Sequence, residues 1–83
     1  MKYLEIVIDR QCCNEKEISI DNFQKKIQNK LSEYKIKFAY DNSPSDAFCN
    51  YGYTQIGFLN ASKEEQYSVT ETINSIFNEL QQI

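Results

Sequence analysis

The sequence predicts an α+β fold with the element order β-α-β-β-α. Three observations support this class: three short segments alternate apolar and polar residues, two longer segments repeat apolar residues every three or four positions, and a polar cluster holding the only proline separates the second and third alternating segments. The chain has 83 residues, a length at which one modest hydrophobic core can form. We therefore expect a single domain spanning residues 1–83.

The first strand is predicted over residues 2–9. Leu4, Ile6 and Ile8 fall on one face, and the residues between them fall on the other. The following segment, 10–17, is polar and charged, so we expect a loop there.

The first helix is predicted to begin after Ser19, whose hydroxyl is suited to cap a helix N-terminus. Asp21 would lie in the first turn, where the helix dipole favours an anion. Its apolar stripe consists of Ile20, Phe23, Ile27, Leu31 and Tyr34. Because Tyr34 is the last residue of this stripe, we expect the helix to end near it.

The second strand is predicted over residues 35–40, with Ile36, Phe38 and Tyr40 on one face. The turn-forming segment 41–46 would lead into a third strand over 48–59, antiparallel to the second. In that strand Thr54, Ile56 and Phe58 are expected to face the core. The opposite face is expected to carry Tyr51, Tyr53, Gln55, Gly57 and Leu59.

The last helix has two candidate capping boxes, Ser62 with Glu65 and Ser68 with Glu71, and we favour the first. Its apolar stripe comprises Val69, Ile73, Ile76, Phe77 and Leu80, with Ile83 a further candidate.

The predicted order allows one simple topology. A right-handed crossover makes the first two strands parallel, and the third strand is most simply inserted between them. This is a split βαβ arrangement, which resembles the ferredoxin-like layout without its last strand. The sheet would be mixed, with both helices on one face. Strand 1 would then be an open edge, and one face of the sheet would lack cover.

Composition excludes several functional classes. The chain has no histidine, which removes histidine-based triads and metal sites. Its net charge of −3 argues against nonspecific nucleic-acid binding. The charge is uneven, because residues 1–40 carry eight basic and six acidic side chains (+2) and residues 41–83 carry one basic and six acidic (−5). We find no catalytic set, metal set or cofactor motif, so we expect a protein that is not an enzyme.

Cellular location is predicted from two features. The N-terminal segment is too charged for a signal peptide or a membrane span, which predicts a cytoplasmic protein without membrane contact. The three cysteines, Cys12, Cys13 and Cys49, fit no disulfide framework and are expected to be reduced.

The uncovered sheet face is the main functional signal, because exposed aromatic patches usually bind something. It would carry Tyr3, Val7, Ala39, Tyr51, Tyr53 and Leu59, with Glu5, Lys35 and Lys37 at its rim. We predict a protein partner and a homodimer formed through the strand 1 edge or the open face. The predicted protein-binding residues are Tyr3, Val7, Tyr40, Asp41, Asp46, Phe48, Tyr51, Tyr53, Glu64 and Glu71.

The leading hypothesis is therefore a small inhibitor or adaptor that acts by protein–protein contact. Phage-encoded inhibitors of the anti-CRISPR type are similar in size and acidity, so this is one form of the hypothesis. An RNA-associated factor that stacks bases on the tyrosines is the first alternative. A thiol or soft-metal carrier using Cys12 and Cys13 is the second.

Overall fold

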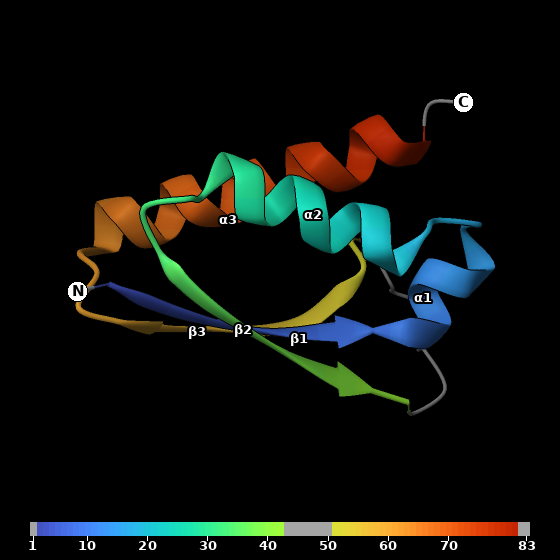
Figure 1. The fold of residues 1–83 in the computed structure, drawn as a ribbon, viewed down its shortest axis with the longest axis horizontal. Helices are drawn as coiled ribbons and strands as arrows, with labels where there is room; N and C mark the ends of the chain where they lie inside the picture. The colour runs from blue at the N-terminus through green and yellow to red at the C-terminus, as the bar shows by residue number, and fades with distance from the viewer. Residues whose placement is uncertain (1, 43–50, 82–83) are drawn as a thin grey trace.

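The computed structural model describes residues 2–42 and 51–81 and confirms the α+β class. Its elements, in chain order, are β1 (Tyr3–Asp9), α1 (Arg10–Glu15), α2 (Ile20–Lys30), β2 (Lys35–Asp41), β3 (Tyr53–Leu59) and α3 (Lys63–Gln81). The three strands form one mixed sheet, and α2 and α3 lie side by side over one of its faces (Figure 1).

The core lies between the sheet and the two long helices. Alternation along β1 directs Leu4, Ile6 and Ile8 into this layer, where each is at most 2% exposed. Phe23 of α2 meets Phe77 of α3 edge to face, with ring centroids 5.4 Å apart. The remaining buried apolar residues are Cys12, Cys13, Ile18, Ile27, Leu31, Val69, Ile73 and Ile76.

The strand order is β2-β1-β3, which corrects the predicted insertion of the third strand between the first two. β1 pairs in parallel with β2, as expected for a β-α-β unit, and antiparallel with β3 on its other side. The central place suits β1, because it is the strand with the most buried residues and both of its edges find backbone partners. The predicted open edge of strand 1, and a homodimer formed through it, are therefore wrong.

A β-bulge changes which side chains of β3 face the core. Ile6 pairs with Ile56 and Val7 with Gln55, but Ile8 pairs with Tyr53, so Thr54 is an extra residue. Tyr53 consequently packs against the core, and its hydroxyl donates to Asn74 Oδ1 of α3 at 2.8 Å. The predicted core position of Thr54 and the predicted open-face positions of Tyr51 and Tyr53 are wrong, because the alternation shifts by one residue at the bulge.

A short helix occupies most of the segment predicted to be a loop. Asp9 caps α1, since its Oδ1 accepts a hydrogen bond from the Cys12 backbone N–H at 3.0 Å. The adjacent Cys12 and Cys13 are both fully buried, and this buried pair anchors the helix to the core. The segment lacks the longer apolar periodicity by which the other helices were recognised.

The two long helices begin where predicted. Ser19 Oγ accepts from the Asn22 N–H at 3.3 Å, and Ser62 Oγ accepts from the Glu65 N–H at 3.1 Å. The predicted end of the first helix near Tyr34 is four residues late, because Leu31 has φ −116° and ψ 42° and ends α2 after Lys30.

An ion pair connects the first strand to the last helix. Lys2 Nζ lies 2.6 Å from Glu65 Oε2, and the Tyr34 hydroxyl donates to the same oxygen at 3.2 Å. The hydrogen bond from Lys2 lowers the pKa of Glu65 below its usual value, despite some desolvation. This contact joins the beginning of β1, the α2–β2 connection and the first turn of α3.

Gly52 occupies a position where a side chain has no room. Its φ is +77°, and a Cβ built there would lie 2.5 Å from Phe77 Cε1 and 3.2 Å from Cys13 Sγ. Its carbonyl accepts from the Asp9 N–H at 3.0 Å, so the backbone is held close to the core at this point. Gly57 differs, because a Cβ there would lie 3.8 Å from its nearest neighbours on Glu5.

We predict that Gly52→Ala lowers the free energy of unfolding by about 2–4 kcal/mol, since it combines overpacking with a left-handed backbone. Gly57→Ala is the matched control and should leave that free energy unchanged or raise it by up to about 1 kcal/mol. Urea titrations of the two variants measure both values. Equal destabilisation by both substitutions would contradict the packing described around Gly52.

We also predict a pH-dependent effect of Glu65→Gln. The folded-state pKa of Glu65 is lowered, so its stabilisation is present at neutral pH and is lost as pH falls through that pKa. The variant should be less stable than the parent at neutral pH, and the difference should shrink under acid. Glu64→Gln controls for the helix dipole, because Glu64 is an exposed neighbour in the same turn. A difference that persists unchanged in acid would contradict the ion pair's role.

Candidate functional site

The candidate site is the face of the sheet opposite α2 and α3, here called the open face. Within residues 2–42 and 51–81, no helix covers it (Figure 1). The strand register arranges its side chains in three rows across the sheet. From β2 through β1 to β3, the rows are Lys35, Tyr3 and Leu59, then Lys37, Glu5 and Gly57, then Ala39, Val7 and Gln55.

A shallow groove of about 510 Å³ lies in the first two rows of this face. Gly57 has no side chain to fill its position, and this leaves space beside the Glu5 side chain. Tyr3 and Leu59 flank the space and are 39% and 57% exposed. The groove therefore offers a recess next to two partly exposed apolar side chains.

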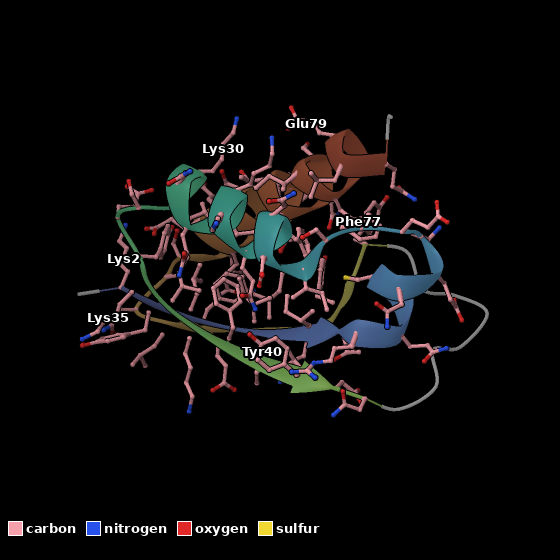
Figure 2. All side chains as sticks on the ribbon, turned by 45° about the vertical axis from the view of Figure 1, so that its right-hand side comes forward. Lys2, Lys30, Lys35, Tyr40, Phe77 and Glu79 are labelled. Atoms are coloured by element: carbon pink, nitrogen blue, oxygen red, sulfur yellow. The ribbon has the colours of Figure 1, made fainter. Side chains whose placement is uncertain are left out.

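Lysines give the β2 side of the groove a positive charge. Lys37 Nζ lies 3.9 Å from Glu5 Oε2, a long contact between exposed side chains that contributes little to stability. Lys35 forms no ion pair with any other residue that the structure describes. In Figure 2, Lys35 lies at the beginning of β2, on the other side of the molecule from Lys30 and Glu79 of the helix layer. The groove can therefore accept an apolar group next to an anion.

Of the predicted binding residues, Tyr3 and Val7 lie on the open face. Tyr51 and Tyr53 instead pack against the core on the helix side. The aromatic platform required by the RNA alternative is thus reduced to Tyr3.

Tyr40 lies in β2, on the side of the sheet that faces the helices (Figure 2). The Arg10 guanidinium lies 4.3 Å from its ring centroid, and Gln24 Nε2 donates to its hydroxyl. Asp41 ends β2 and is half-buried. Asp46 and Phe48 lie outside the described residues, so the predicted contact tip of that loop stays a prediction.

The acidic residues of α3 lie away from the open face. Glu64 and Glu71 are exposed, and Glu71 lines a second hollow of about 400 Å³ between α2 and α3. Lys30 and Glu79 line the same hollow and project from the outer side of the helix layer (Figure 2). The predicted site residues are therefore divided between opposite sides of the molecule.

The cysteines do not form an open thiol pair. Cys12 is disulfide-bonded, which corrects the prediction that its thiol is reduced. Cys13 is a free cysteine, and burial, with the nearby Asp9 charge, raises its pKa to about 11. At neutral pH the Cys13 thiol is therefore protonated and buried.

Two further findings concern the described part of the chain. It contains no group of three or more Cys, Asp or Glu side chains placed to hold a metal ion. None of its helices is both long enough and apolar enough to cross a membrane.

Five open-face residues that line the groove were absent from the predicted binding set: Glu5, Lys35, Lys37, Gly57 and Leu59. Strand alternation had placed them on this face, but the importance of Gly57 depends on what surrounds it. A glycine in a strand signals close approach or a bulge. Here the bulge occurs at Thr54, and Gly57 instead opens space next to the cross-strand pair Tyr3 and Leu59.

Comparison with known proteins does not change this description. No family model, curated protein or solved structure matches the chain.

Proposed function

We propose that the chain is a protein-binding module whose contact surface is the open face, and that it acts as an inhibitor or adaptor by contact alone. The observation that supports this most directly is the groove at Gly57, next to the cross-strand pair Tyr3 and Leu59. A sheet face that presents a recess and partly exposed apolar side chains gains stability when a partner removes that surface from water.

The groove also restricts the chemistry of the partner. An apolar side chain from the partner would fill the space left by Gly57 and contact Tyr3 and Leu59. A carboxylate next to that side chain would meet Lys35, which has no ion-pair partner in the described chain, and Lys37, whose contact with Glu5 is long. We therefore infer a partner segment with an aliphatic or aromatic residue beside Asp or Glu.

This proposal is tested with a displayed library of random peptides selected on the immobilised wild-type chain. The selected peptides should be enriched in an apolar residue next to Asp or Glu. Gly57→Leu should weaken their binding about tenfold or more, because the new side chain occupies the recess of a central contact. Lys35→Glu should weaken it through repulsion.

Asn29→Leu is the matched control, since it adds the same side chain at an exposed position on α2. It should leave peptide binding unchanged. Thermal melting should show that Gly57→Leu remains folded, since the backbone there leaves room for a side chain. Peptides that bind wild type and folded Gly57→Leu equally would contradict the proposal.

A further inference from the structure

The two outer edges of the sheet differ in charge. β2 carries Lys35, Lys37 and Asp41, whereas all seven residues of β3 are uncharged and none is proline. Charged side chains on an edge strand oppose pairing with other strands, and long uncharged edges favour it. The β2 edge has this protection, and the β3 edge lacks it.

No other described strand pairs with the outer edge of β3, because the sheet ends there. Within residues 2–42 and 51–81, no strand pairs with the backbone donors and acceptors along that edge. β2 is the opposite edge, and Tyr40 near its end is engaged by Arg10 and Gln24. The unprotected edge is therefore on the β3 side of the sheet.

The side of α3 above this edge carries an exposed aromatic residue. Asn74 accepts the hydroxyl hydrogen bond of Tyr53, which places that side of α3 over β3. Tyr67 precedes Asn74 by seven residues, about two helical turns, and so lies on the same side. Tyr67 is 70% exposed, more than any other large hydrophobic residue in the described chain.

Charged residues flank Tyr67 along α3. Glu79 lines the hollow beside Lys30 of α2, whereas Glu71 borders that hollow and also lies one turn from Tyr67. Thr70, between Tyr67 and Asn74, donates its hydroxyl to the Gln66 carbonyl at 2.9 Å. The charged residues at three- and four-residue steps from Tyr67 are Lys63, Glu64 and Glu71.

We propose that the β3 edge is the binding site for a second copy of this chain, which joins the two sheets through antiparallel β3–β3 pairing. A two-fold axis pairs β3 of one copy with β3 of the other in the antiparallel direction. The same surface of each copy then lies in the interface. If the strand carried charged residues, this pairing would place like charges close together. β3 has no charged residue, so this repulsion does not arise. Tyr67 of each copy would pack across the axis against the helix layer of the other. This inference concerns the edge and does not depend on the open-face proposal.

The test is the mass of the full chain in solution, measured by sedimentation equilibrium from low to high micromolar concentration. Wild type should reach twice the chain mass of 9.8 kDa. Thr54→Lys gives β3 an edge lysine of the kind that β2 carries, and Tyr67→Glu places an acid at the helix contact. Each should raise the dimer dissociation constant about tenfold or more.

Two matched variants separate this edge from the other surfaces. Tyr3→Glu makes the same change on the open face, and Gln28→Lys adds a lysine on exposed α2. Both should dimerise like wild type. Thr54 and Tyr67 are exposed, so their variants should keep the wild-type melting temperature, apart from the contribution of dimerisation itself.

Hydrogen exchange provides a second measurement that reports on the backbone. As the concentration rises, amides of β3 should become protected while those of β2 remain unchanged. A wild-type chain that is monomeric throughout the range would overturn the proposal. A dimer disrupted by Tyr3→Glu but retained by Thr54→Lys and Tyr67→Glu would also overturn it.

Discussion

The fold depends on the two-sided pairing of β1. This strand pairs in parallel with β2 along one edge and antiparallel with β3 along the other, so its backbone groups have partners on both sides. Its inward side chains, Leu4, Ile6 and Ile8, are almost fully buried beneath the two long helices. Since the most apolar strand holds the centre, the described residues leave one sheet face and the outer edges of β2 and β3 uncovered.

These surfaces differ in the kind of contact they favour. The open face combines a recess at Gly57 with lysines of β2, which suits a partner carrying an apolar group and an anion. The β3 edge combines uncharged backbone with Tyr67, which suits a symmetric strand pairing. Leu59 ends β3 and flanks the groove, so the two surfaces adjoin at this residue. A dimer formed through β3 would place two open faces on one continuous sheet, which would allow bivalent binding.

The uneven charge of the sequence also acquires a spatial meaning. The basic residues Lys35 and Lys37 lie along the groove of the open face. The acidic residues Glu71 and Glu79 lie on the helix layer, where Lys30 lines the same hollow. The acidic second half of the chain is therefore partly balanced by a lysine from the first half.

Local patterns predicted most of the elements, because each depends on residues close in sequence. The alternation in β1, the Ser19 cap of α2 and the Ser62 cap of α3 are all of this kind. The strand order could not be predicted in the same way. Strands that are consecutive in sequence usually pair as neighbours, whereas β3 pairs with β1 on the side opposite β2.

The candidate site was predicted less completely than the fold. Tyr3 and Val7 were placed on the correct face by alternation, but one extra residue at Thr54 turned Tyr53 into the core. Such a bulge has no sequence signature strong enough to fix its position. The helix α1 was not predicted for a different reason. Its only buried residues are the adjacent Cys12 and Cys13, and two adjacent residues show no helical periodicity.

Inter-strand nuclear Overhauser contacts test most directly whether β1 lies between the other two strands. The register places Ile6 opposite Phe38 of β2 and opposite Ile56 of β3. Backbone contacts from Ile6 to both residues, in one monomeric sample at low concentration, are the predicted result. Backbone contacts between Phe38 and Ile56 with none from Ile6 to Phe38 would show β3 in the centre and would contradict the account.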